Sequence, residues 1–298
     1  MQKEIDIVAF GPEHIDGALA LSRIENWPHR REDWQLAQQL STGVVAIDCD
    51  GRVVGTTLLT PYSTDCATIN MVITDKSMRG RGIGRRLMEG AFTLAGDRPL
   101  RLVATQEGLP LYEKLGFVAI GAIRQHQGEV HPLEKPEGIE TMAAGDVAAI
   151  KAMDRDAFGA DRSDLIDALV ELGQIAVLRK DGSIEAYAAI RPFGRGEVIG
   201  PVIAPDAETA RALITYHAAS RPGAFLRVDT GSDAGVAPWL AEIGLAHVGG
   251  GIAMLRPPIE HAPRRQKMIG RRDPGQIGQP AVLKRDLDRI GAARGGCR

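Results

Sequence analysis

Residues 79–84, with the sequence RGRGIG, bring three glycines and two arginines together between two apolar segments. The apolar run 69–73 predicts a buried strand, and apolar residues recur at helical spacing from Gly82 onward. The glycines therefore lie at a strand-to-helix turn, where the backbone can approach a ligand closely. Free N–H groups and the positive dipole end of the first helical turn attract phosphate at such a turn. The segment predicts a site for a phosphate-bearing ligand.

Two common phosphate-binding loops do not fit these residues. A Walker loop needs Lys and then Ser or Thr after its last glycine, whereas Gly84 is followed by Arg85 and Arg86. A dinucleotide fingerprint that started at Gly80 would need glycine at position 85. What remains is the spacing Arg79-x-x-Gly82-x-Gly84. An ordinary glycine-rich turn with solvated arginines would show the same residues, so the rest of the chain must decide.

The elements that position this segment follow a definite order. From hydrophobic periodicity and turn signals we expect, in sequence, a strand, two helices, three strands, a helix, a strand, a helix and a strand. Their ranges are 5–9, 12–24, 31–40, 44–47, 53–59, 69–73, 82 onward, 100–104, 109–115 and 117–123. This order, together with the glycine spacing and the segment 111–117 (LYEKLGF), resembles the GNAT acetyltransferase superfamily, whose members use acetyl-CoA.

The resemblance implies an α+β fold with a mixed central sheet flanked by helices, and it assigns roles to residues of this chain. The loop would hold the CoA pyrophosphate with its backbone, and the strand before it would be splayed open, so that Ile73 offers an N–H to the thioester oxygen. Thr105 stands where many members have asparagine. The residues implied to contact CoA are Met71, Val72, Ile73, Arg79, Gly80, Arg81, Gly82, Ile83, Gly84, Thr105 and Tyr112.

Catalysis would need a proton donor for the leaving thiolate and a route for the proton of the acceptor amine. Tyr112, close to the thioester sulfur in the family, is the expected general acid. Many members use a glutamate on the central strand as base, but this chain has Asn70 in that neighbourhood, and asparagine cannot act as a base. By elimination the base candidates, acting through water, are Glu25, His29 and Asp65. Trp27, His29 and Asn70 are expected at the acceptor site.

The second half of the chain repeats the first. Residues 139–145 echo 5–11, residues 182–192 overlay 51–61, and residues 238–245 overlay 110–117. The offset between the copies falls slowly, from 134 to 131 to 128. We therefore expect two tandem acyl-CoA N-acyltransferase (GNAT) folds in the order 1–124, a polar linker 125–138, 139–257, and a basic tail 258–298.

The second copy has lost the residues of the phosphate site. If residues 201–203 correspond to 71–73, then 209–214 would replace the glycine turn, and this segment has no glycine. Leu240 occupies the position of Tyr112. We expect that this copy does not bind CoA in the usual way, and that it supports the first domain or shapes the acceptor pocket.

The composition of the chain limits the number of domains and the kinds of partner that we expect. At 298 residues and 44% hydrophobic, the chain suggests two domains rather than one, and its net charge of −2 predicts no general attraction to nucleic acid or membrane. The three cysteines, Cys49, Cys66 and Cys297, lack metal-ligand or disulfide spacing, so we expect no metal site and a reducing, cytoplasmic setting. No signal peptide or long apolar run occurs, so we expect no membrane span.

The tail 258–298 differs from the rest of the chain in charge. It holds ten Lys or Arg against four acidic residues, which gives it about +6 and the remainder about −8. This composition is typical of a solvated, partly disordered extension. Docking on the acidic body or on nucleic acid is the other interpretation, although the tail has no aromatic residue on which bases could stack.

These observations together predict an acetyl-CoA-dependent N-acetyltransferase that transfers the acetyl group directly to the amine of a small molecule in a ternary complex. A noncatalytic acyl-CoA-binding or regulatory module, and a peptide or protein N-acetyltransferase, are the alternatives. A homodimer is also compatible with the sequence. Nothing in the sequence names the acceptor amine.

Overall fold

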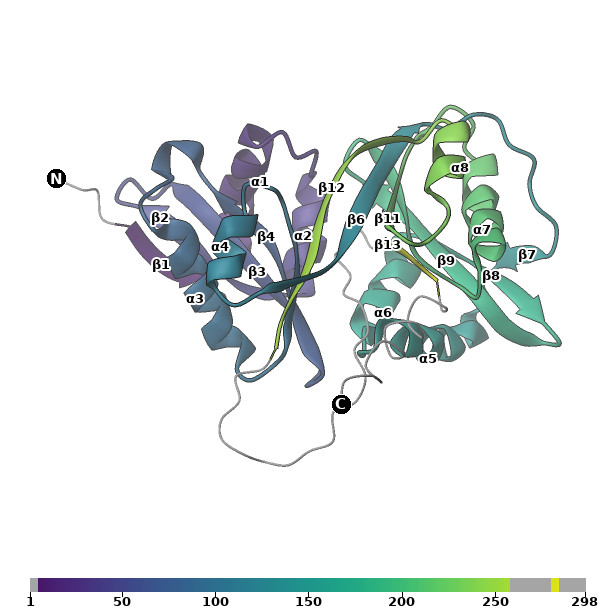
Figure 1. The fold of residues 1–298 in the computed structure, drawn as a ribbon, viewed down its shortest axis with the longest axis horizontal. Helices are drawn as coiled ribbons and strands as arrows, with labels where there is room; N and C mark the ends of the chain where they lie inside the picture. The colour runs from purple at the N-terminus through teal and green to yellow at the C-terminus, as the bar shows by residue number, and fades with distance from the viewer. Residues whose placement is uncertain (1–4, 258–279, 284–298) are drawn as a thin grey trace, which may run out of the picture.

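The computed structural model describes residues 5–257 and 280–283, and its elements follow the predicted order (Figure 1). The first half contains six strands and four α-helices besides two short 3-10 turns. They are β1 (Ile5–Ala9), α1 (Ile15–Ile24), α2 (Arg31–Gln39), β2 (Thr42–Asp48), β3 (Val53–Tyr62), β4 (Cys66–Thr74), α3 (Ile83–Ala95), β5 (Leu100–Ala104), α4 (Leu109–Lys114) and β6 (Val118–Glu129).

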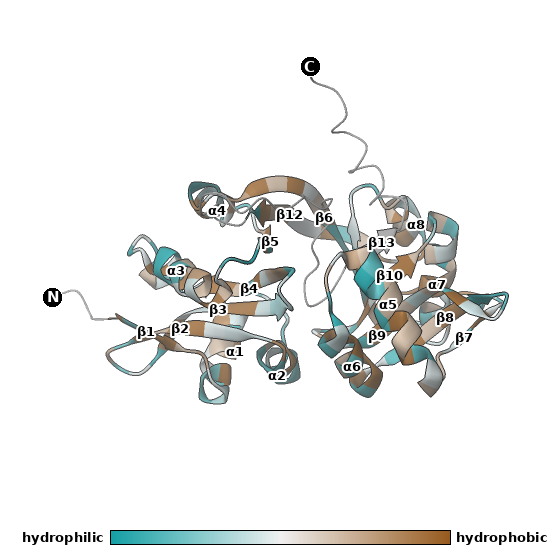
Figure 2. Ribbon diagram, turned by 90° about the horizontal axis from the view of Figure 1, so that it is seen from below, coloured by the Kyte–Doolittle hydropathy of each residue, from teal (hydrophilic) through white to brown (hydrophobic). Residues whose placement is uncertain are grey.

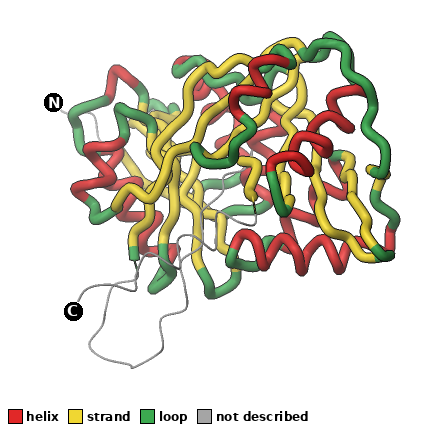
Figure 3. The backbone as a smooth tube through the Cα atoms, turned by 45° about the vertical axis from the view of Figure 1, so that its right-hand side comes forward, coloured by secondary structure: helices red, strands yellow, loops and turns green. Residues whose placement is uncertain are grey.

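The second half repeats this order element by element, as the internal repeat predicted. Its elements are β7 (Ile139–Thr141), α5 (Val147–Phe158), α6 (Ser163–Leu172), β8 (Gln174–Lys180), β9 (Ser183–Phe193), β10 (Gly196–Ala204), α7 (Ala207–Ala219), β11 (Phe225–Gly231), α8 (Ala237–Glu242) and β12 (Ala246–Arg256). The strands run through the middle of the molecule with the helices outside them (Figure 3). The predicted α+β class, with a mixed sheet flanked by helices, is confirmed, although the strands of the two halves form one continuous sheet.

The two halves exchange their last strands. β12, from the second half, pairs with β5 of the first half over five residue pairs, from Ile252–Ala104 to Arg256–Leu100. β6, from the first half, pairs with β11 of the second half over seven residue pairs, and with β12 on its other side. The strands β6 and β12 thus run between the two lobes and join them into one sheet (Figure 1).

The exchange corrects the predicted linker. Residues 125–129 belong to β6 rather than to a linker, and only the segment after Glu129 connects the halves. The polar sequence of these residues concealed the strand, because β6 is held by backbone pairing with a strand on each side and not by an alternating apolar face. His126, in this stretch, is buried. The boundaries 1–124 and 139–257 stay a prediction.

Helices cover both faces of the first-half sheet, with α1 and α2 on one side of β1–β4 and α3 on the other (Figure 2). The apolar core beneath α3 and α4 contains Leu59, Ile69 and Tyr112, and it also takes in Met254 from β12. The core beneath α1 and α2 is built around Trp34, Leu58 and Ile73. Among the described residues, no helix is long and apolar enough to cross a membrane.

The second half lacks the glycine loop for a reason other than the one expected. Eight residues, 75–82, separate β4 from α3, whereas only two, 205–206, separate β10 from α7. The alignment that placed 209–214 at the loop was wrong, since these residues lie inside α7. The loop has been shortened by about six residues, not substituted. Leu240 is fully buried in the core of the second half.

Most of the predicted basic tail, 258–298, lies outside the described residues. The exception is β13 (Pro280–Leu283), a strand that the sequence did not predict. It pairs in parallel with β10 at residues 202–204 and with β11 at residues 229–230. β13 therefore occupies the space where β10 and β11 separate.

We predict that neither half folds alone. A fragment of residues 1–135 would lose β12, and β5 would then keep only its two residue pairs with β4. Urea unfolding followed by circular dichroism should show no cooperative transition for fragments 1–135 and 136–298 made separately. Coexpression of the two should restore the transition. A cooperative transition of fragment 1–135 near that of the whole chain would contradict the prediction.

Candidate active site

A cleft of about 640 Å³ lies beside the glycine loop, where β4 and β5 separate. β4 and β5 pair in parallel only at Ala67–Leu100 and Thr68–Arg101 and then diverge. The pairing of β4 with β3 is interrupted by a bulge, at which Met71 takes a φ of 52°, unusual for a residue with a side chain. Bulge and divergence together open the sheet. The cleft walls come from the end of α1, from β4, from the loop and start of α3, and from the β5–α4 connection.

Eleven of the residues singled out in the sequence line this cleft. They are Glu25, Trp27, Val72, Ile73, Arg79, Gly80, Gly82, Ile83, Gly84, Thr105 and Tyr112. The glycine loop and Tyr112, 28 or more positions apart in the chain, therefore face one space. Sequence reasoning missed other lining residues, which are Thr74, Lys76, Met78, Arg85, Gln106, Glu107, Gly108 and Leu111. Their adjacency to the predicted residues was the only signal in the sequence.

The glycine loop has the geometry of an anion cradle. Gly80 and Gly82 take φ values of 77° and 75°, which favour glycine, and a Cβ on either would meet no atom within 4 Å. Gly82 is the N-cap of the 13-residue helix α3. In the first turn of α3, the N–H of Arg86 donates to Gly82 O at 3.1 Å. Among the described residues, the preceding N–H groups of Gly82, Ile83 and Gly84 donate to no backbone carbonyl and remain available. The loop fits a phosphate group.

Arg79 is held between two carboxylates across the mouth of the cleft. Its Nη2 donates to Glu25 Oε1 at 3.0 Å and its Nη1 to Glu107 Oε2 at 3.0 Å. Lys76 Nζ also lies 3.4 Å from the other Glu25 oxygen. Glu25 is at the end of α1 and Glu107 is between β5 and α4, so these ion pairs connect the walls of the cleft. A phosphate would compete with both carboxylates for Arg79.

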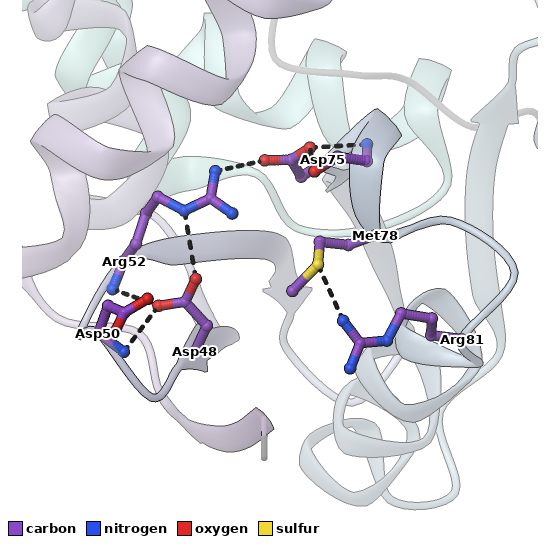
Figure 4. Close-up of polar contacts among 7 residues, drawn as sticks. Asp48, Asp50, Arg52, Asp75, Met78 and Arg81 are labelled. Atoms are coloured by element: carbon purple, nitrogen blue, oxygen red, sulfur yellow. Dashed lines mark hydrogen bonds and ion pairs between the residues drawn. The ribbon is translucent and has the colours of Figure 1, made fainter. Parts of the chain in front are cut away.

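The loop is anchored at its start by a buried carboxylate (Figure 4). Asp75 accepts hydrogen bonds from Ser77 N at 2.9 Å and from Arg52 Nη1 at 2.8 Å, and Arg52 Nε donates to Asp48 at 3.2 Å. Burial alone would raise the pKa of Asp75, but the hydrogen bonds from Ser77 and the Arg52 charge hold that pKa below its usual value. Arg52 thereby fixes the loop to the β2–β3 hairpin.

Two of the residues expected to contact CoA do not line the cleft. Arg81 does not line it and instead directs Nη1 at Met78 Sδ, 3.0 Å away (Figure 4). The side chain of Met71 packs against the core beneath α1 and α2, and its carbonyl oxygen accepts a hydrogen bond from Thr56 Oγ1 at 2.7 Å. The bulge that opens the strand also points Met71 to the opposite face of the sheet.

Tyr112 closes the inner end of the cleft from α4. The side chain is 7% exposed and packs edge-on against Phe117, with ring centroids 6.0 Å apart. Burial raises its pKa to about 12, so the phenol keeps its proton at every physiological pH. Within the described part of the chain the hydroxyl has no hydrogen-bond partner, and it is therefore free to donate to a ligand.

The structure separates the three base candidates. Glu25 lines the cleft, but its carboxylate is ion-paired. Asp65 is exposed in the β3–β4 turn and does not line the cleft. His29 is directed toward the second half, where its ring meets that of Phe193 edge-on at 5.7 Å. Burial lowers the pKa of His29 to about 4, opposed by Asp33 and reinforced by Arg227, so it is a weak base.

Of the expected acceptor residues, only Trp27 lines the cleft. Asn70 lies on β4 two positions before Val72, with 6% of its surface exposed. Its Nδ2 donates to Thr60 Oγ1 at 2.8 Å. Its Oδ1 is buried and has no hydrogen-bond partner. Thr105 is exposed, and its Oγ1 accepts the Gly108 N–H at 3.2 Å at the start of α4.

Comparison with known proteins agrees with this geometry. Two family models described as "Acetyltransferase (GNAT) domain" match the chain, one at residues 41–119 and the other at residues 150–270. Together the matches cover more than half of the chain, one in each half. The chain therefore belongs to the GNAT acetyltransferase family and carries two GNAT domains.

The chain is also similar to individual proteins and solved structures over most of its length. The "Uncharacterized N-acetyltransferase YitH" of Bacillus subtilis (strain 168) is 28% identical over 235 residues, which is 76% of this chain and 83% of the relative. A candidate acetyltransferase of Pyrococcus horikoshii has a TM-score of 0.72 at 20% identity, covering 86% of this chain and 89% of its own. A tandem GNAT protein from the clavulanic acid biosynthesis pathway has a TM-score of 0.59 at 14% identity, covering 85% and 98%. These structural similarities establish the fold alone.

We predict that replacing Glu107 by Gln strengthens CoA binding. The substitution removes one of the two carboxylates that compete with phosphate for Arg79. Because this exposed ion pair is worth about 0.2–1 kcal/mol, Kd should fall about 1.4- to fivefold. Isothermal titration calorimetry at low salt would measure the change. Glu140→Gln, which removes the exposed carboxylate paired with Arg179 in the second half, is the control and should leave Kd unchanged. A weaker or equal affinity for Glu107→Gln would show that Arg79 does not meet the ligand.

Proposed function

We propose that this protein is an acetyl-CoA-dependent N-acetyltransferase whose first half transfers the acetyl group directly to the amine of a small molecule. The observation that carries the proposal is the joint placement of the glycine loop and Tyr112 on one cleft. A site for CoA needs a phosphate cradle and, one pantetheine length away, a group that deals with the leaving sulfur. A cytoplasmic location is part of the proposal, and Cys49 and Cys66 are both free thiols.

The residues of the loop would bind the donor substrate. The available N–H groups of Gly82, Ile83 and Gly84 would hold the pyrophosphate, and Arg79, Lys76 and Arg85 would add positive charge. Val72 and Ile73 line the cleft where β4 has left β5, so their backbone groups on that side would meet the pantetheine amides. An N–H of this segment would polarise the thioester carbonyl.

Transfer then requires one bond to form and one to break. The neutral amine attacks the thioester carbon, the C–N bond forms, the C–S bond breaks, and the thiolate leaves with its electron pair. Tyr112 would donate its O–H to this sulfur. The ammonium proton of the acceptor must be lost to water before attack, and Glu25 is the base candidate that lines the cleft.

A noncatalytic CoA-binding module is the second candidate. It is favoured by the ion pairs of Glu25 and Glu107, which leave neither carboxylate of the cleft mouth free in this conformation. CoA release from acetyl-CoA with any primary amine in a broad panel would exclude it. The second half would bind no donor in either case, because its β10–α7 connection is too short to form the cradle.

We predict that Gly82→Ala weakens CoA binding by much more than the strain of placing alanine at a positive φ would explain. A Cβ on Gly82 would project into the open space where the pyrophosphate is proposed to lie. Gly51→Ala is the matched control, because Gly51 has a φ of 77°, close to the 75° of Gly82, and an equally open surrounding in the β2–β3 turn. Both variants should lose about 1–2 kcal/mol of stability. Calorimetry should show at least about tenfold weaker CoA binding for Gly82→Ala alone, and equal affinities would refute the donor site.

We predict that Tyr112→Phe binds CoA with nearly unchanged affinity but turns over about 10- to 100-fold more slowly, since a hydrogen bond to a charged sulfur contributes about 1.5–3 kcal/mol. The pH profile adds a second readout. Because the pKa of Tyr112 is raised to about 12, the wild-type rate should rise with pH as the amine loses its proton and should not fall again below about pH 10. A thiol-release assay with an amine panel measures both. A descending limb near pH 7–8 that Tyr112→Phe retains would contradict the assignment.

A further inference from the structure

The sheet of the second half has an opening that corresponds to the cleft of the first half. β10 and β11 pair in parallel only at residues 197–199 and 226–228, and they then diverge. β13 lies beside both strands beyond this point (Figure 1), paired in parallel with β10 at residues 202–204 and with β11 at residues 229–230. One of the chain's own segments thus occupies the opening.

The residues of β10 that pair with β13 are the counterparts of residues that line the cleft. Residues 202–204 end β10 in the way that residues 72–74 end β4. The middle residue of each set lies opposite an equivalent position of the internal repeat, Tyr187 on β9 and Thr56 on β3. Residues 72–74 line the cleft beside the glycine loop. A peptide segment therefore lies in the second half where pantetheine is proposed to lie in the first.

The opening presents backbone groups and no free charge. Residues 202–204 and Thr230 are each at most 1% exposed. Buried N–H and C=O groups are rarely left unpaired, so the facing edges of two diverging strands need a partner. The charged side chain at this edge, Asp229, is neutralised by Arg227, whose Nε and Nη2 donate to it at 2.9 and 2.6 Å. The opening therefore suits an uncharged extended chain, unlike the anion cradle of the first half.

The sequence of β13 suits such an opening. Residues 281–283 (AVL) are the only run of three Ala, Val, Leu, Ile or Met residues in the tail 258–298. Pro280, which has no N–H to donate, is the first residue of the strand, where proline is tolerated. Ala281 is paired with both neighbouring strands. The segment thus offers the two edges an uninterrupted set of backbone donors after its first residue.

We propose that the second half is a peptide-binding domain and that its ligand is residues 280–283 of the same chain. The domain recognises an uncharged, aliphatic segment through its backbone, by parallel strand addition between β10 and β11. A tethered ligand acts at an effective concentration on the order of millimolar, so even a weak site stays occupied. The inference goes beyond the proposed function and does not depend on CoA binding or acetyl transfer.

Disulfide trapping in the full chain tests where the segment lies. In a background of Cys49→Ser and Cys297→Ser, Ala204→Cys is combined with Leu283→Cys, because these two residues are direct partners on neighbouring strands. Such strands lie about 4.8 Å apart, within the Cα separations of disulfides. Mild oxidation should produce a crosslink within one chain, identified by mass spectrometry of the digested protein. Ala204→Cys with Leu287→Cys is the control and should crosslink at least about tenfold less.

Competition with a free peptide tests recognition. A fluorescein-labelled peptide of residues 276–287 is titrated with the full chain, and its anisotropy is measured. The Val282→Pro chain, which loses a backbone N–H in the middle of β13, should bind the peptide at least about tenfold more tightly than wild type, whose own segment competes. Leu287→Pro, a proline outside β13, should behave as wild type. A peptide that carries Val282→Pro should bind neither protein.

The outcomes distinguish the possible occupants of the opening. A crosslink between two chains would overturn the assignment within one chain and would assign the opening to the segment of a second copy. Crosslinking no stronger than in the control, or equal peptide binding by wild type and the Val282→Pro chain, would show that residues 280–283 do not occupy the opening. If Val282→Pro prevents folding, the crosslink alone decides, because the cysteine variants keep every backbone N–H of β13.

Discussion

The pairing of β12 with β5 is the interaction on which the active site depends. β4 must separate from β5 to open the cleft, and after Thr68 the two strands share no further residue pair. Without β12, one edge of β5 would be unpaired, and the other edge would keep only its two residue pairs with β4. Five residue pairs with β12 hold β5 in the sheet instead, and β12 comes from the second half. The half that lacks the phosphate cradle therefore keeps the cradle's cleft open.

The second half shows a different way of satisfying the same split between neighbouring strands. β10 and β11 pair only between residues 197–199 and 226–228 and then diverge as β4 and β5 do. The backbone groups exposed by this divergence need partners, because buried N–H and C=O groups are rarely left unpaired. β13 supplies them by pairing in parallel with both strands. The second half keeps the divergence of the two strands, whereas the connection that has eight residues in the first half has only two.

Sequence reasoning found what is encoded locally and missed what is encoded between distant segments. The loop, its helix and Tyr112 were predictable because glycine spacing and periodicity act over a few residues, and the internal repeat fixed the order of the second half. The exchange of β6 and β12 was not predictable, because the sequence of a polar strand does not indicate which strands it pairs with. The ion pair of Arg52 with Asp75 was not predictable either. Arg52 lies 23 residues before Asp75, in a polar turn whose side chains are expected to face solvent. The contact of the Arg81 side chain with Met78 was not predictable either, because a spacing pattern does not define where a flexible side chain points.

In the proposed transfer, the burial of Tyr112 determines how this residue would act. Its pKa of about 12 lies well above the roughly 8.5 of an ordinary thiol, so complete proton transfer to a free thiolate would be uphill by about 3–4 pKa units, or about 5 kcal/mol. A hydrogen bond to the sulfur as negative charge develops there avoids this cost and still stabilises the transition state more than the ground state. The proton that finally neutralises the thiolate then comes from the amine nitrogen or from solvent. The apolar wall around Tyr112, built by Phe117 and the neighbouring core, strengthens that hydrogen bond because no water competes for the hydroxyl on that side.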